Sequence, residues 1–397
     1  MKPAAAAALV CATTTMAFAQ TRYLVNEPGV WKPWKPLTAI ASARAERGAT
    51  AADVKAFEST LLELNAILRR APGVAAPRGF SVETWGNLSG YRQLVSGQPA
   101  GRTLPLAGGL TFGAFPIFEY TRAGTVIRED TGETALFTFH VNELEPWLIG
   151  GQRPTEWEAI ETDAFLQPQP NGEVAGIPRY GDIVVLKKNP ASLWVPLPMQ
   201  AALDLVVTVR QTQLAERRQT VESQRRSYEL WKTPAKRAER MAGYKGVAAT
   251  LPDGAKYLAG VDQQEKDVEA ALAKEAGPES SAAKDVRALE ASLGDLEAWL
   301  GELSASDRQA SACYAKSGTT LRTRFRIGTA PDCEPLARPN RQFFSPAVPR
   351  SAAQVVIIGQ IARCFDHQPA DAGPWGCSAN RQLLQTLDKP AVLSLLK

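Results

Sequence analysis

The sequence is poor in the residues and motifs that most often mark an enzyme. It contains only two histidines, His140 and His367, which limits acid–base chemistry that depends on imidazole. It has no Walker loop, no dinucleotide-binding glycine fingerprint and no His-Glu-x-x-His zinc helix. A nucleophile elbow is also missing, because Gly86-Asn87-Leu88-Ser89-Gly90 has its serine one place too late. These absences argue against an enzyme, although many enzymes lack all of these motifs.

The chain also lacks a large excess of either charge. Its 45 Lys and Arg residues nearly balance 41 Asp and Glu residues, and the formal net charge is +4 at pH 7. Proteins that bind nucleic acid usually carry a large positive excess. We therefore expect no nucleic-acid partner.

No apolar run is long enough to cross a membrane, which takes about 18 residues or more. The first residues nevertheless stand apart. Lys2 precedes an uncharged stretch from Ala4 to Phe18, and Ala17-Phe18-Ala19 matches a small-x-small cleavage site. The sequence thus predicts a signal peptide over residues 1–19, cleavage near Ala19 and a periplasmic or secreted protein without a transmembrane segment.

Cysteine is scarce in the predicted mature chain. Cys11 would leave with the signal peptide, and its lipidation is disfavoured because Val10 is a poor residue at the preceding position. An even number of cysteines in an exported chain indicates disulfides, and we favour pairing between sequence neighbours over the two other pairings. Metal ligation is the weaker alternative because Cys-x-x-Cys is absent, so we expect no metal and no cofactor. The four remaining cysteines are Cys313, Cys333, Cys364 and Cys377.

Hydrophobic periodicity predicts an α+β protein. A helix is expected from a capping box at Thr50 and Asp53 to Pro72-Gly73, since apolar residues recur there at helical spacing. The period then changes to two, which indicates strands. The turn between the last two of these strands is expected at Asp130-Thr131-Gly132. The three strands are expected at Leu110 to Tyr120, Val126 to Glu129 and Ala135 to Asn142.

The middle of the chain is predicted to contain a hairpin that leads into one long helix. Ile183 to Leu186 and Leu193 to Val195 are extended apolar segments around turn residues, and they predict a hairpin. Pro196 and Pro198 then precede a helix that is expected to continue to about Trp231, because its apolar residues alternate in spacings of three and four.

Strands are expected again near the C-terminus. Leu321 to Ile327 alternates apolar and basic residues, which predicts a half-buried strand with a basic outer face. Gln354 to Ile361 is almost wholly apolar, as in a strand covered on both faces. The tail from Arg381 to Leu396 is expected to be a helix interrupted at Pro390.

The charges of the helical block are sorted along the chain. Arg210 to Lys245 contains ten bases and four acids, whereas Asp253 to Glu279 contains three bases and seven acids. Lys284 to Asp307 likewise contains two bases and six acids, on a helix with an unbroken leucine-rich seam. A basic outgoing helix that lies antiparallel against acidic returning helices would match both patterns.

These patterns together predict the domain organisation. We expect a globular α+β domain with an antiparallel or mixed sheet, formed by residues 20–198 and 309–397. Residues 199–308 are expected to form an inserted antiparallel, coiled-coil-like helical hairpin. A helix of about 34 residues would reach roughly 50 Å at 1.5 Å per residue, which is longer than a compact domain needs.

Two groups of residues are candidates for a catalytic site. His140, Glu143 and Glu145 could form a base oriented by a carboxylate, but a hydrogen-bonded strand histidine is the favoured interpretation. The acids from Glu143 to Asp163 could also hold a glycosidase pair or a calcium ion. No specific spacing supports either site, and a solvated acidic loop is the favoured interpretation.

A third group could bind an anion. Arg322, Arg324 and Arg326 would lie in a row on the outer face of their strand and could meet phospholipid headgroups or a polyanionic glycan. Positive charges also protect strand edges against aggregation, and this simpler role is favoured.

Three places in the sequence resemble a group of exported bacterial proteins of unknown function. They are Pro77 to Phe80, Leu193 to Leu197, and the segment from Arg338-Pro339-Asn340 through Pro349-Arg350 to Ile357. The resemblance implies export and a shared fold, and it brings no activity, cofactor or catalytic residue.

The leading functional hypothesis is therefore a non-enzymatic envelope protein that binds or scaffolds an envelope protein or polymer through the helical arm or the sheet face. The alternative is a hydrolase that acts on an envelope polymer with His140 and the nearby acids.

Overall fold

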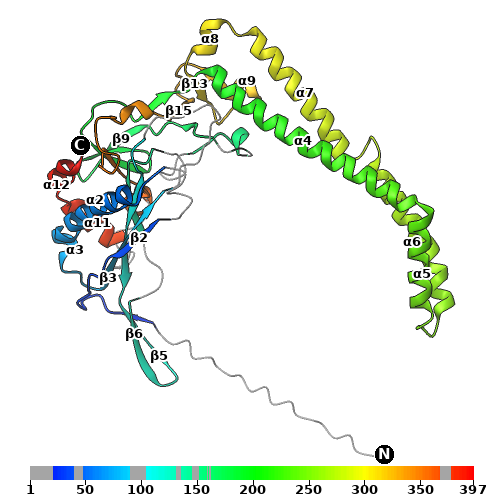
Figure 1. The fold of residues 1–397 in the computed structure, drawn as a ribbon, viewed down its shortest axis with the longest axis horizontal. Coiled ribbons are helices and arrows are strands. Elements are labelled where there is room, and N and C mark those ends of the chain that lie inside the picture. Colours follow the sequence, from blue (N-terminus) through cyan, green and yellow to red (C-terminus); the bar gives the residue numbers. More distant parts are fainter. Residues whose placement is uncertain are drawn as a thin grey trace, which may run out of the picture.

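The computed structural model describes residues 21–39, 48–89, 104–130, 136–144, 152–158, 160, 162–366 and 377–397. These residues form a globular body, from which a curved helical arm projects (Figure 1). The architecture is α+β, with antiparallel and mixed sheets and a long helical hairpin, as the sequence predicts. The predicted signal peptide and its cleavage site lie outside the described residues.

The largest sheet has eight strands and combines segments from before and after the arm. Its order is β2-β3-β4-β7-β16-β11-β10-β9, and β2 with β3 is its one parallel pair. Strand β16 is buried on both faces, because its side chains alternate between two apolar cores, as the sequence predicts. The strands are β2 (Lys35–Ala39), β3 (Phe80–Leu88), β4 (Gly108–Pro116), β7 (Leu136–Val141), β9 (Pro170–Val174), β10 (Ile177–Tyr180), β11 (Ile183–Lys187) and β16 (Val355–Ile358).

Helices cover one face of this sheet (Figure 1). The predicted capping box of Thr50 and Asp53 starts the first of them, and its Phe57 packs in one core with Phe139 of the sheet. The C-terminal helix is broken as predicted, with Pro390 in the first turn of the last piece. The helices are α2 (Ala51–Arg70), α3 (Pro72–Ala75), α10 (Ile361–Phe365), α11 (Cys377–Thr386) and α12 (Lys389–Leu395).

Two smaller sheets complete the body. A five-stranded sheet has the order β12-β15-β13-β14, with β8 paired to β15, and a three-stranded sheet has the order β1-β5-β6. The first comprises β8 (Phe165–Leu166), β12 (Trp194–Pro196), β13 (Ala312–Tyr314), β14 (Phe325–Ile327) and β15 (Glu334–Pro339). The second comprises β1 (Arg22–Tyr23), β5 (Phe118–Arg122) and β6 (Thr125–Glu129).

Both disulfides connect sequence neighbours, as predicted. Cys313 of β13 is bonded to Cys333, and Cys364 of α10 is bonded to Cys377 at the start of α11. Their Cα atoms lie 5.5 and 4.9 Å apart, within the usual range for a disulfide. The alternative that these cysteines bind a metal is therefore wrong.

Three local predictions are wrong because distant strands decide the pairing. β11 and β12 do not form a hairpin: β11 pairs with β10 and β16, while β12 pairs with β15 in another sheet. β6 pairs with β5 rather than with β7, and the predicted single strand over 110–120 is divided between β4 and β5. Leu321–Arg324 forms the short helix α9, so only Phe325–Ile327 of the predicted strand is extended.

The arm is a helical hairpin with a bend. Helix α4 has 34 residues, and α7 lies antiparallel along it, while α6 packs on α5 and on α4. The bend falls at Thr233, because Pro234 cannot donate its backbone nitrogen and disfavours a helical residue before it. The helices are α4 (Met199–Lys232), α5 (Pro234–Ala248), α6 (Gly254–Ala276), α7 (Ser281–Glu302) and α8 (Ala305–Gln309).

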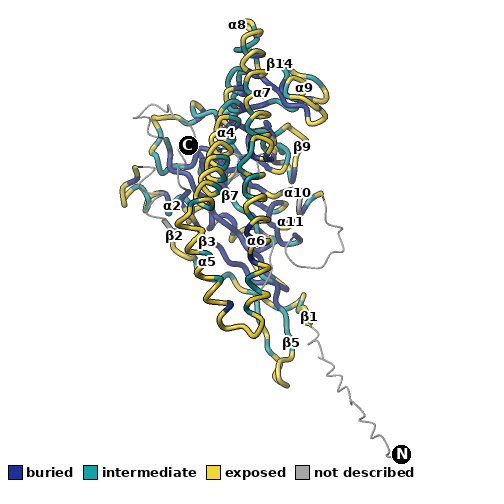
Figure 2. Tube along the Cα trace, turned by 90° about the vertical axis from the view of Figure 1, so that its right-hand side faces the viewer, coloured by how far each residue is buried: buried dark blue, intermediate teal, exposed yellow. Residues whose placement is uncertain are grey.

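The arm shares a buried core with the body where the two join, and scattered arm residues beyond it, such as Val261 and Glu265, are also buried. Ala202, Leu203 and Val206 of α4 share an apolar core with Leu296 and Trp299 of α7 and with strands of the five-stranded sheet. Away from this junction most arm residues are exposed or partly exposed (Figure 2). None of the described helices is long and apolar enough to span a membrane.

Candidate functional site

His140 and Glu143 meet in a buried cluster that also includes Ser89. The Ser89 hydroxyl donates to Glu143 Oε1, and His140 Nδ1 contacts Glu143 Oε2. The exposed fractions are 8% for His140, 1% for Glu143 and 7% for Ser89. The sequence suggested the pair of His140 and Glu143. It gave no signal for the contact with Ser89, which directly follows β3 and lies 54 residues before Glu143 in the chain.

Asn142, which lies between His140 and Glu143 in the chain, has an unusual backbone conformation. Its φ of 59° lies in the left-handed region, which asparagine adopts more readily than most residues. Its amide nitrogen donates to the carbonyl oxygens of Leu106 and Ala352, and its Oδ1 accepts from the backbone nitrogen of Gln354. These bonds hold Asn142 in this conformation directly after β7.

The chemistry of this cluster is limited by its burial. A carboxylate that contacts Nδ1 of a histidine can orient the ring for acid–base catalysis. A substrate must nevertheless reach Nε2, and His140 is more than nine-tenths buried. Three cavities of 320, 500 and 700 Å³ on the described residues are lined by other side chains. The arrangement therefore favours a structural role at the end of β7.

Among the described acids that follow Glu143, Glu156 and Asp163 have different arginine partners. Glu145 lies outside the described residues. Glu156 is paired with Arg324, and Asp163 lies 3.8 Å from Arg341. Both carboxylates are less than one-tenth exposed, so the expectation of a solvated acidic loop is wrong for them and for Glu143. They do not meet His140, and no calcium or glycosidase arrangement forms from them.

The three arginines of the predicted row each contact a different carboxylate. Arg322 pairs with Glu302, Arg324 with Glu156, and Arg326 with Asp332. The row is broken because two arginines lie on α9 and one lies on β14. Anion binding by these side chains stays a prediction, and the three ion pairs weigh against it.

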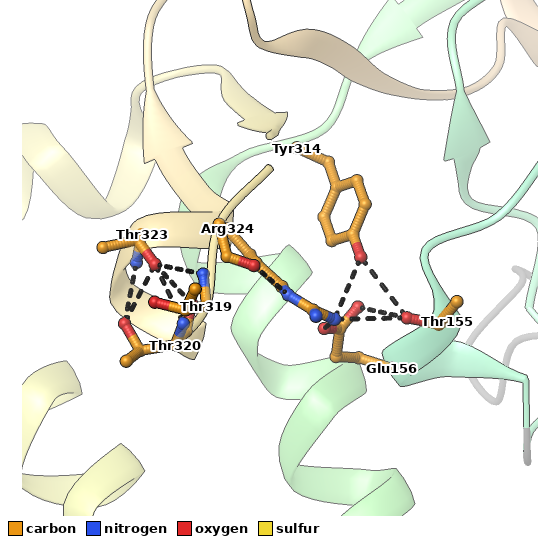
Figure 3. Close-up of polar contacts among 8 residues, drawn as sticks. Thr155, Glu156, Tyr314, Thr319, Thr320, Thr323 and Arg324 are labelled. Carbon is orange, nitrogen blue, oxygen red and sulfur yellow. Dashed lines mark hydrogen bonds and ion pairs between the residues drawn. The ribbon is translucent and has the colours of Figure 1, made fainter. Parts of the chain in front are cut away.

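Arg324 has the least exposed side chain of the three, and Figure 3 shows its contacts. It reaches from α9 to Glu156 of the short helix η1 (Thr155–Trp157), while its Nε donates to the carbonyl oxygen of Gly318 at 2.7 Å. The capping box of Thr320 and Thr323 holds α9 in place beside it.

These contacts fasten the base of the arm. Helix η1 packs on α4, and Trp157 lies against Phe325 in the shared core. Arg322 connects α9 to the end of α7 through Glu302, and this hydrogen bond lowers the pKa of the Glu302 carboxyl. The Arg322 guanidinium also lies 5.5 Å from the ring centre of Trp299. The first and the last long helix of the arm, α4 and α7, are therefore both held to the body at the base of the arm.

Ion pairs also connect the outgoing and returning helices, as the sorted charges suggest. Arg218 donates to Glu290 at 2.7 Å, and Arg217 lies 3.5 Å from Asp285. These pairs flank a polar cavity of 700 Å³ between α4 and α7. Basic residues of the arm thus find acidic partners within the same chain.

The bend of the arm is stabilised by Arg240. Its guanidinium forms hydrogen bonds of 2.8 to 3.2 Å with both oxygens of Glu265. It also lies 3.5 Å from the ring centre of Trp231 and donates to the Trp231 carbonyl oxygen. Hydrogen bonding from Arg240 lowers the pKa of Glu265 and raises that of the guanidinium.

The projecting arm is thus the candidate functional surface. Among the described residues, no group of three or more His, Cys, Asp or Glu side chains is placed to hold a metal ion.

Comparison with protein-family models found no matching family, and comparisons with curated proteins and with solved structures found no match either.

Proposed function

We propose that the protein is an exported, non-enzymatic binding or scaffolding protein that engages a component of the cell envelope through its arm. The shape of the arm carries this proposal. Helices α5 and α6 pack on each other and on α4, whereas the body is contacted by the base of α4 and of α7. A 34-residue helix is roughly 50 Å long, so most of the hairpin contributes no packing to the body.

The anchoring of the arm supports a binding role. Ion pairs and a shared core hold the base, and Arg240 fixes the bend. A surface that is rigid before binding loses less conformational entropy when a partner docks. The two disulfides support export, because such bridges form and persist outside the cytoplasm.

Site-specific photocrosslinking in cells that produce the protein tests this proposal. A photoreactive residue would replace Gln264, which is exposed on α6, or Lys55, which is exposed on α2 of the body. We expect a covalent adduct from position 264 and none from position 55. Adducts from position 55 alone would contradict a role for the arm.

The hydrolase hypothesis has one observation in its favour, which is the contact of His140 and Ser89 with Glu143. Purified protein would be assayed for release of soluble fragments from envelope polysaccharide and peptidoglycan. Our proposal predicts no release. Turnover that disappears in His140→Asn, while the variant keeps its unfolding temperature, would establish the hydrolase instead.

A further inference from the structure

The far end of the arm has an unusual composition for an exposed turn. Residues 247–255 comprise the end of α5, the turn and the start of α6, and they contain a single charged residue, Asp253. Val247 is 47% exposed and Leu251 is 43% exposed, and Pro252 is exposed beside them. Nearly half of each of these two apolar residues is therefore exposed at the extremity of a projecting hairpin, where exposed apolar surface often marks a binding site.

Basic residues surround this apolar turn. Lys245 precedes it on α5 and Lys256 follows it on α6, so the antiparallel helices bring both lysines to the same end of the arm. Both are exposed and take part in none of the ion pairs found among the described residues. From residue 234 to residue 256 the bases outnumber the acids by five to two: Lys236, Arg237, Arg240, Lys245 and Lys256 against Glu239 and Asp253.

We propose that this tip docks on the surface of an anionic lipid bilayer. Val247 and Leu251 enter the boundary between headgroups and acyl chains, and Lys245 and Lys256 contact lipid phosphates. This inference rests on the proposed function and names the partner of the arm. Peripheral membrane segments combine exposed apolar residues with a basic rim in the same way.

Two observations favour a lipid surface over a protein partner. Protein interfaces usually centre on aromatic or arginine side chains that fill pockets. At this tip the aromatic residues Tyr244 and Tyr257 are partly buried, and Arg240 is occupied by Glu265 and Trp231. The protruding residues are aliphatic and lie at a convex end, where they can enter a fluid layer without a matching cavity.

Vesicle co-sedimentation of the full chain tests the proposal. The probes are vesicles of phosphatidylcholine alone and vesicles that also contain phosphatidylglycerol. We expect binding to the anionic vesicles that weakens as salt rises, because the lysine contribution is electrostatic. The double variant Lys245→Glu with Lys256→Glu is expected to lose about tenfold or more in affinity. Val247→Ser with Leu251→Ser should lose about tenfold through lost apolar burial.

Matched controls lie elsewhere on the arm. Leu230→Ser removes a leucine near the bend that is even more exposed than Leu251, and Lys266→Glu reverses an exposed charge in the middle of α6. Both should bind vesicles like the original chain, and circular dichroism should show unchanged helix content in all variants. Equal losses in controls and tip variants, or equal binding to both vesicle types, would overturn the proposal.

The outcomes also separate this inference from the proposed function. If vesicles do not bind but position 264 still yields adducts with one defined envelope protein, the arm binds a protein and the lipid proposal is wrong. If neither vesicles nor crosslinks report binding, both proposals fail.

Discussion

Replacing Glu265 by Gln removes one charge from the bend of the arm while nearly conserving the shape of the side chain. The carboxylate accepts hydrogen bonds from Nε and Nη2 of Arg240. The side chains are 19% exposed for Arg240 and 9% exposed for Glu265, so the pair lies between a surface pair and a buried one. Surface pairs contribute about 0–1 kcal/mol, and breaking a buried pair costs about 3–5 kcal/mol. We therefore expect Glu265→Gln to cost about 2 kcal/mol.

Amide hydrogen exchange can measure this cost where it arises. Exchange in α5 and α6 should become faster by roughly 30-fold, the factor that corresponds to about 2 kcal/mol. Exchange in α2, on the far side of the body, should stay unchanged. A double-mutant cycle with Arg240→Ala isolates the pairwise term. A coupling energy below about 0.5 kcal/mol, or equal effects in α2, would refute this account of the bend.

The same pair predicts a pH dependence. Arg240 holds the pKa of Glu265 below its ordinary value of 4.5 in the folded chain. Because the folded pKa is the lower one, the pair contributes its full stability above pH 4.5 and loses it as the pH falls through the folded pKa. The protection of α5 and α6 should therefore fall in acid, and this fall should be much smaller in Glu265→Gln.

Three further substitutions test other parts of the structure. Trp299→Ala should lower the free energy of unfolding by about 3–5 kcal/mol in denaturant titration, because a large side chain leaves the core at the arm base. Cys313→Ser with Cys333→Ser should lower it by about 3 kcal/mol, since the open loop regains conformational entropy in the unfolded chain. Glu143→Gln should lower it by about 1–3 kcal/mol in the same titration, because Ser89 and His140 lose a buried charged acceptor.

One control serves all three substitutions. Val126 is 65% exposed on β6, and Val126→Ala should change the free energy of unfolding by less than about 0.5 kcal/mol. A loss below about 1 kcal/mol for Trp299→Ala would contradict the shared core at the arm base.

The features that could be predicted from the sequence depend on neighbouring residues. The capping box of Thr50 and Asp53 joins residues three positions apart, and the length of α4 follows from a period that repeats within each turn. The disulfides connect neighbouring cysteines, where few alternatives exist. In each case the deciding interaction lies within a short stretch of chain.

The features that could not be predicted depend on distant residues. The pairing of β12 with β15 joins segments far apart in the sequence, and no local pattern selects it over a hairpin with β11. Glu156 looked solvated because its partner, Arg324, lies 168 residues further along the chain. The strand predicted from Leu321 to Ile327 is wrong for a local reason. The capping box at Thr320 starts a helical turn within this alternating pattern.

The position of β16 determines when the large sheet can be completed, if the chain is synthesised or exported with its N-terminus first. β16 lies between β7 and β11, and both of these strands precede the arm in the sequence. The edge of each strand that faces β16 therefore has no partner until residue 358 has emerged. The helices α4 to α7 pack mainly on one another, so this hairpin can form before that point. Exposed strand edges invite pairing with other chains. A chain that stops after the arm would therefore be prone to aggregation, and its last quarter closes the sheet as well as extending it.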